Sequence, residues 1–112
     1  MNILQRLISN VLVVEISTEL ASKVNIDEFS NFLRAQIEKG NKNVVVDLSD
    51  IRYFNSSHVG MLVSGYTTTV SSGGDMKLAS ISDRVLKALE INRLNLVFDI
   101  YSSVDEAVDS YN

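Results

Sequence analysis

The sequence predicts an α/β fold, a mixed sheet of four or five strands with about four helices in the order ββαβαβαβα. Two observations on the pattern support this prediction. Short β-branched apolar runs alternate with segments whose apolar residues recur at helical spacing. The repeated strand–helix–strand units imply mainly parallel strands joined by right-handed crossovers. Since the chain has 112 residues and no proline, residues 1–112 are expected to form a single domain.

The strands are predicted from short runs of β-branched and apolar residues. Ser9 and Asn10 separate the first two runs and predict a tight hairpin turn, which adds an antiparallel edge to the sheet. The third run is continuous instead of alternating, so we expect that strand to be buried on both faces. The predicted strands cover residues 3–8, 11–17, 44–48, 76–79 and 96–101.

Four helices are predicted between and after these strands, and each begins beside a polar residue that can cap it. Asn25 with Glu28 resembles a capping box, and so does Ser103 with Glu106. The second helix begins near Ser56 and carries an apolar stripe at positions i, i+3, i+4, i+7 and i+11. The residues of that stripe are Val59, Leu62, Val63, Tyr66 and Val70. The third helix follows Ser82 and Asp83.

The composition excludes several classes of function. Hydrophobic residues make up 46% of the chain and charged residues 21%, as in soluble globular domains. Cysteine is absent, which excludes disulfides, thiolate metal sites and cysteine nucleophiles. The net charge of −4, without a basic cluster, has the wrong sign for binding nucleic acid. The apolar runs are far shorter than the ~20 residues that span a bilayer, so we expect a cytoplasmic protein without membrane insertion.

The residue pattern gives little support to catalysis or to a cofactor. His58 is the single histidine and follows Ser56 and Ser57 directly. Because adjacent residues on a helix point to different sides, a Ser–His pair is disfavoured and we interpret His58 as a surface histidine. Asp47 and Asp50 are only two carboxylates, too few for a persuasive metal site, and Asp47 is expected to bond to nearby backbone. We therefore expect no enzyme and no cofactor.

Residues 54–60 carry the most informative signal, and two interpretations of it stay open. A serine just before a helix usually caps the first free N–H groups and does nothing else. Alternatively, a phosphate on Ser56 or Ser57 would meet the positive potential of a helix N-terminus. The residues alone favour capping.

Several segments of the chain resemble the STAS-domain anti-sigma factor antagonists of bacteria. Residues 44–49 resemble the V-x-D-L strand of that family, and residues 54–62 resemble its D-S-S/T/A-G-L-G motif with the following apolar helix. Residues 73–78 and 94–101 are similar to its G-G-x-L-x-L strand and its closing L-x-x-V-F-x-I-Y strand. The similar segments occur in the right order over essentially the whole chain, which implies a STAS-like fold.

The resemblance implies a switch. Such antagonists bind an anti-sigma factor, usually a serine kinase, and so release a sigma factor. The kinase phosphorylates the serine that aligns with Ser56, with the adjacent Ser57 as second choice, and a PP2C-type phosphatase restores the free hydroxyl. Three positions differ from the family pattern: Asn55 replaces an aspartate, His58 replaces a glycine, and Ala21 replaces a loop aspartate.

Those differences keep an alternative open, in which the domain is not phosphorylated. It would then be a scaffold or the cytoplasmic STAS subunit of a lipid-transport ABC complex. In either case we expect the partner surface to combine the start of the second helix with the loop at residues 18–21. The candidate contact residues are Glu19, Asn55, Ser57, His58, Val59 and Met61.

Overall fold

The computed structural model of the protein describes residues 3–17, 26–52 and 54–112. Along these segments the elements follow the predicted ββαβαβαβα order, with one added 3-10 turn, η1, before the last strand. In chain order they are β1 (Leu4–Ile8), β2 (Val11–Ser17), α2 (Ile26–Glu38), β3 (Asn43–Asp50), α3 (Ser56–Ser71), β4 (Asp75–Ala79), α4 (Asp83–Ile91), η1 (Leu94–Leu96), β5 (Ile100–Tyr101) and α5 (Val104–Asp109).

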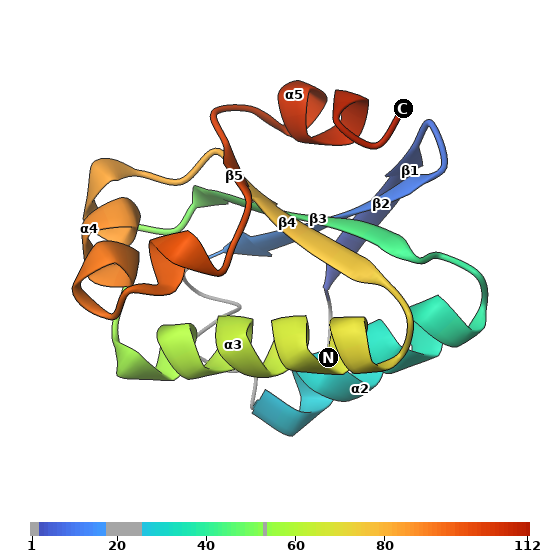
Figure 1. Ribbon diagram of the computed structural model, residues 1–112, viewed down its shortest axis with the longest axis horizontal. Helices are drawn as coiled ribbons and strands as arrows, with labels where there is room; N and C mark the ends of the chain where they lie inside the picture. Colours follow the sequence, from blue (N-terminus) through green and yellow to red (C-terminus); the bar gives the residue numbers. More distant parts are fainter. Residues whose placement is uncertain (1–2, 18–25, 53) are drawn as a thin grey trace.

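The five strands form one mixed sheet in the spatial order β1-β2-β3-β4-β5 (Figure 1). β1 and β2 are antiparallel, and β2 to β5 run parallel to one another. The prediction of a hairpin is confirmed: Ser9 and Asn10 have φ of 51° and 67°. Two successive residues with positive φ are typical of a type I′ turn, whose twist suits antiparallel strands.

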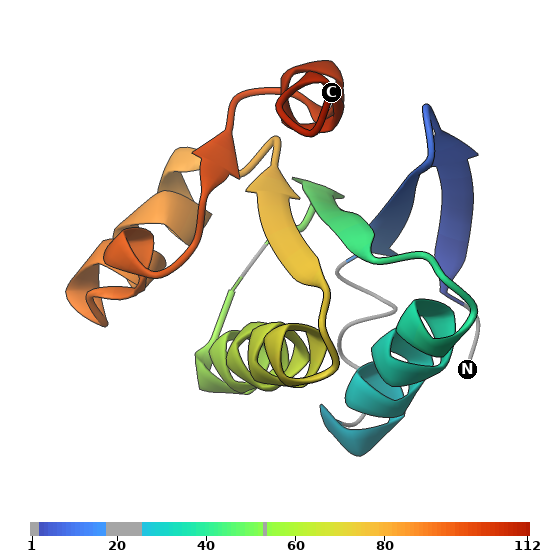
Figure 2. The ribbon, with the colours of Figure 1, turned by 45° about the vertical axis from the view of Figure 1, so that its right-hand side comes forward.

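The sheet separates two hydrophobic clusters. Figure 2 shows α2 and α3 on one side of the sheet and α5 on the other. Side chains from α2, α3 and α4 pack against one face of the sheet and form the larger cluster. α5 covers part of the opposite face, where Ala107 and Val108 contact β2, β3 and β4 residues. β3 is therefore buried on both sides, which confirms the expectation drawn from its continuous apolar run.

A buried lysine helps to fix the end of the chain on that second face. The Nζ atom of Lys77 lies 4.0 Å from the ring centroid of Tyr111 and 2.7 Å from Oγ of Ser110. The Tyr111 hydroxyl donates to the carbonyl of Val44 at 3.2 Å. Burial, followed by the nearby Asp75 carboxylate, raises the pKa of Tyr111, so this phenol stays a hydrogen-bond donor.

The predicted apolar stripe of α3 is right only in part: Leu62 is buried and Tyr66 packs against the larger core, but the buried face is shifted by one residue position. The buried residues have the same spacing but are His58, Met61, Leu62, Gly65 and Thr69. Val63 and Val70 are exposed instead. The small residue Gly65 explains the choice, because a Cβ built there would lie 2.6 Å from the Phe29 ring. The close approach of α2 thus determines which face of α3 is buried.

The last predicted strand is also shorter than expected. Arg93 has a φ of 59°, and the carbonyl of Leu94 then accepts N–H groups from Val97 and Phe98, both at 3.0 Å. These hydrogen bonds turn the backbone and leave Leu96 82% exposed, so an extended strand begins only at Ile100. Across the described segments, no helix is long and apolar enough to cross a membrane.

Candidate functional site

The start of α3 is held by Asn55, which corrects the expectation that a serine caps this helix. The Asn55 side-chain oxygen accepts the backbone N–H groups of Ser57 at 2.9 Å and of His58 at 3.3 Å. Asn55 has an extended backbone, as an N-cap residue requires. Ser56 is consequently the first residue inside the helix, and its hydroxyl is not needed for capping.

His58 completes the cap from the other side, and its interpretation as a surface histidine is wrong. Its side chain is only 2% exposed, and its Nδ1 atom accepts the backbone N–H of Asn55 at 3.0 Å. The ring stacks on Phe54 with centroids 5.5 Å apart. The arrangement is a capping box in which imidazole replaces the usual Glu or Gln.

The protonation state of His58 follows from this geometry. Nδ1 must be unprotonated to accept the Asn55 N–H, so the bond requires the neutral imidazole. Burial acts in the same direction and lowers the pKa of His58 below its ordinary value of 6.5. Because its lone pair is engaged in the cap, Nδ1 is not placed to act as a base toward Ser56 or Ser57.

Ser56 and Ser57 are both exposed, and Ser56 lines a cavity of about 250 Å³ between the start of α3 and the end of α4. The other lining residues are Phe54, Asn55, Val59, Ala88, Ile91 and Asn92. Ile91, at the end of α4, is 76% exposed and adds an apolar side chain to this lining. The cavity is therefore mainly apolar, with polar groups from Asn55, Ser56 and Asn92.

The remaining predicted contact residues have different positions. Val59 is half-buried and lines the cavity, which places it beside Ser56. Met61 is 4% exposed and belongs to the larger core, so it is not a surface contact. Glu19 and the rest of the loop at residues 18–21 lie outside the described residues, as does Asn25 of the first predicted capping box.

The α4 residues of the cavity were not found by sequence reasoning. Ala88, Ile91 and Asn92 are about thirty positions away from Ser56 in the chain, and only the fold brings the two segments together. A partial signal exists, because Ile91 lies off the buried face of α4 that Val85 and Leu89 define. That pattern predicts that Ile91 is exposed, but it does not place Ile91 beside Ser56.

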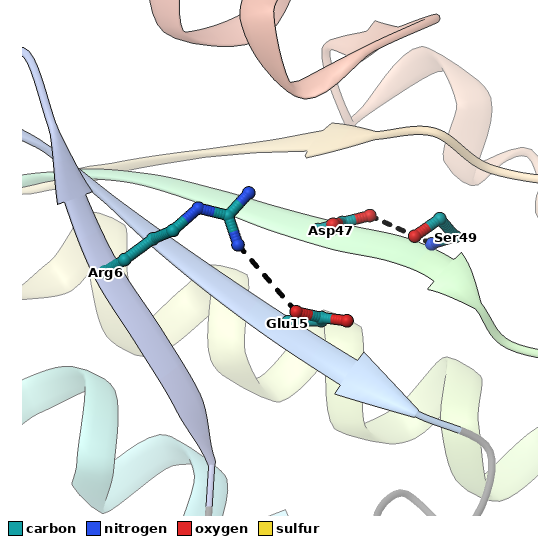
Figure 3. Close-up of polar contacts among 4 residues, drawn as sticks. All are labelled: Arg6, Glu15, Asp47 and Ser49. Atoms are coloured by element: carbon teal, nitrogen blue, oxygen red, sulfur yellow. Dashed lines mark hydrogen bonds and ion pairs between the residues drawn. The ribbon is translucent and has the colours of Figure 1, made fainter.

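Asp47 has the structural role that the sequence predicted. One of its carboxylate oxygens accepts the backbone N–H of Ser49 at 3.0 Å (Figure 3). On the same sheet, Arg6 and Glu15 form an ion pair with nitrogen and oxygen 3.8 Å apart. No group of three or more potential metal ligands occurs within the described part of the chain.

Comparison with known proteins identifies the family. The model of the STAS domain matches residues 2–107. A Thermotoga neapolitana protein, provisionally named an anti-sigma factor antagonist, is 30% identical over 93 residues, which are 83% of this chain and 76% of that protein.

Two solved structures have the same fold. A stressosome structure has a TM-score of 0.82 at 21% identity, over 97% of this chain and 94% of that one. The Bacillus cell fate determinant SpoIIAA in its phosphorylated form has a TM-score of 0.69 at 14% identity, over 99% of this chain and 100% of that one. The match to the domain model covers nearly the whole sequence, and the chain therefore belongs to the STAS domain family.

Proposed function

We propose that this protein is an anti-sigma factor antagonist of the bacterial cytoplasm, controlled by phosphorylation of Ser56. It binds an anti-sigma factor that is a serine kinase, frees the sigma factor, and is restored by a PP2C-type phosphatase after phosphorylation. The names of its relatives support this role. The observation that carries the proposal is Ser56 itself, which is exposed in the first turn of α3 and lines a mainly apolar cavity.

The cap of α3 determines how a phosphate on Ser56 would act. Asn55 already accepts the N–H groups of Ser57 and His58, so those donors are not available to the phosphate. The positive potential of the helix N-terminus still tolerates the new charge, and folding is expected to change little. A partner that fills the adjacent cavity must instead desolvate a dianion, which weakens the complex.

Ser57 is the second candidate for phosphorylation and serves as the internal control. It is exposed like Ser56, but it is not among the residues that line the cavity. A phosphate on Ser57 would therefore lie beside the contact region and not at the edge of the apolar surface. Ser57→Ala is expected to leave release by ATP intact.

The test is incubation with the cognate kinase and ATP, followed by mass spectrometry of the peptide that contains Ser56 and Ser57. We expect one phosphate on Ser56, release of the complex, and retention of the complex by Ser56→Ala. No phosphate on either serine, together with binding that Ser56→Asp leaves unchanged, would refute the switch.

One observation favours the alternative, an unphosphorylated STAS scaffold or the STAS subunit of a lipid-transport ABC complex. Asn55 caps α3 without the negative charge that an aspartate would bring to the kinase contact. In that case the cavity beside Ser56 binds its partner permanently. Purification of the tagged protein with a transporter subunit, instead of a kinase, is the result that this alternative predicts.

A further inference from the structure

β1 forms an open edge of the sheet. It is the first strand in the spatial order and pairs only with β2 among the described elements. Its large apolar side chains are exposed, Leu4 by 63% and Leu7 by 61%. The opposite edge, β5, has only two residues. A five-residue edge strand with exposed leucines, no proline and Arg6 as its one charged residue has little protection against pairing with another strand.

The register of the hairpin indicates which backbone groups face outward. In a two-residue hairpin the residues beside the turn form a hydrogen-bonded pair, here Ile8 and Val11. Bonded and non-bonded pairs then alternate, so Arg6 and Leu4 also direct their backbone groups toward β2. Gln5 and Leu7 therefore direct their N–H and C=O groups away from β2, toward the open edge. If the same alternation continues by one residue beyond β1, Ile3 has the same direction.

We propose that this edge binds a second copy of the chain, with the two β1 strands antiparallel and the two-fold axis at Gln5. Gln5 then faces Gln5 of the second copy, and Leu7 faces Ile3 of the second copy. These are the residues whose backbone groups point outward, so the ladder of hydrogen bonds continues across the axis. The result is one ten-stranded sheet, because each copy contributes five strands.

Apolar packing supports this register. Leu7 is opposite Leu12 of β2 and therefore lies on the face of the larger core. Ile3 packs against the same core as a partly buried residue. Pairing Leu7 with Ile3 of the second copy extends both cores across the axis and covers a leucine that is otherwise exposed.

The charge pattern of β1 is compatible with a second copy and favours this register. Arg6 is the one charged residue of β1, so two copies of this acidic chain can meet here without bringing carboxylates together. With the axis at Gln5, Arg6 faces Leu4 of the second copy and avoids Arg6 of the second copy. Beyond that leucine lies Glu15 of the second copy, because Leu4 and Glu15 are neighbours in the hairpin. An axis at Arg6 would instead place like charges opposite each other.

The first test is sedimentation of the purified chain together with Gln5→Pro. We expect the wild type to be dimeric at about 100 µM and Gln5→Pro to be monomeric. Their melting temperatures should nearly agree when both are measured at a dilution at which the wild type is monomeric as well. Proline removes an N–H that faces outward and leaves the bonds from β1 to β2 in place. A wild type that is monomeric up to about 1 mM would overturn the proposal, as would a dimer that Gln5→Pro does not weaken.

The second test uses the absence of cysteine from the chain. Residues in a hydrogen-bonded antiparallel pair have Cα atoms about 5.5 Å apart, within the range that a disulfide can bridge. Gln5→Cys should therefore form a covalent dimer under mild oxidation, at least about tenfold faster than Arg6→Cys, whose two copies are offset along the strands.

Lys87→Cys, on the exposed surface of α4, is the control for random collisions. Equal rates for Gln5→Cys and Lys87→Cys would refute the dimer. A faster reaction of Arg6→Cys would refute the register. Because the β1 edge and the Ser56 cavity use different residues, failure of this proposal leaves the proposed function unaffected.

Discussion

The helices α3, α4 and α5 all begin next to a serine, but the serines have two different roles. In α4 and α5 the serine precedes the helix and caps it: the hydroxyl oxygens of Ser82 and Ser103 accept backbone N–H groups at 3.2 and 3.1 Å. In α3 the cap is Asn55, and Ser56 occupies the first position inside the helix.

This difference of one position separates a structural hydroxyl from one suited to modification. A phosphate on Ser82 or Ser103 would alter the side chain that caps the helix, and its oxygens would have to replace the hydroxyl oxygen as acceptor of the backbone N–H group. A phosphate on Ser56 leaves the cap of α3 intact, because that cap is made by another side chain. A switch of this kind alters the surface of the domain without unfolding it.

The largest expected effect is on partner binding by Ser56→Asp. The new charge adjoins the apolar cavity, and the affinity for the kinase is expected to fall roughly 30- to 1000-fold, or ~2–4 kcal/mol. Ser82→Asp is the matched control, because aspartate caps helices as well as serine and position 82 does not line the cavity. Isothermal titration calorimetry measures both. Equal losses for the two variants would place the partner surface elsewhere.

The next effect concerns the cap itself. Asn55→Ala removes the acceptor for the N–H groups of Ser57 and His58, and we expect the free energy of unfolding to fall by about 1–2 kcal/mol. Urea denaturation at neutral pH measures this change. Asn55→Asp retains the acceptor and should remain within a few tenths of a kcal/mol of the wild type. A loss as large for Asn55→Asp as for Asn55→Ala would contradict the assigned cap.

A smaller effect is expected in the pH dependence of stability. The folded protein holds His58 neutral and lowers its pKa, whereas the unfolded chain titrates near 6.5. The contribution of His58 is therefore complete above pH 6.5 and declines as the pH falls below that value, since the unfolded state binds the proton more readily. Denaturation of the wild type and His58→Gln between neutral and acidic pH should show this decline in the wild type only. A parallel decline in both variants would assign it to other groups.

The order of elements could be predicted from the sequence because each local signal agrees with the global fold. Ser9 and Asn10 indicated the hairpin, and Ser82 and Ser103 indicated the starts of α4 and α5. The buried face of α3 could not be predicted this way. Two stripes one residue apart have the same spacing, and the choice depends on the approach of α2 to Gly65.

The candidate site was also predictable only in part, because some of its features depend on tertiary contacts. Ser56 was singled out because residues 54–62 resemble the family motif, and its position after a strand and at the start of a helix agrees with that choice. The burial of His58 was missed, because the bond from Asn55 N–H to its Nδ1 atom gives a histidine the place that a capping box normally reserves for Glu or Gln. The cavity formed with Ile91 depends on tertiary contacts that no local pattern contains.

The smallest expected effect tests most directly the difference between Ser56 and the capping serines Ser82 and Ser103. Ser56→Ala should change the free energy of unfolding by no more than about 0.3 kcal/mol, because Asn55 caps α3 and alanine is a good helix former. Ser82→Ala and Ser103→Ala should each cost about 0.5–2 kcal/mol, since each removes an acceptor of a backbone N–H. Urea denaturation of the three variants compares them under one condition. If Ser56→Ala proves as costly as the other two, Ser56 contributes to the cap, and its phosphorylation would disturb the helix as well as the partner surface.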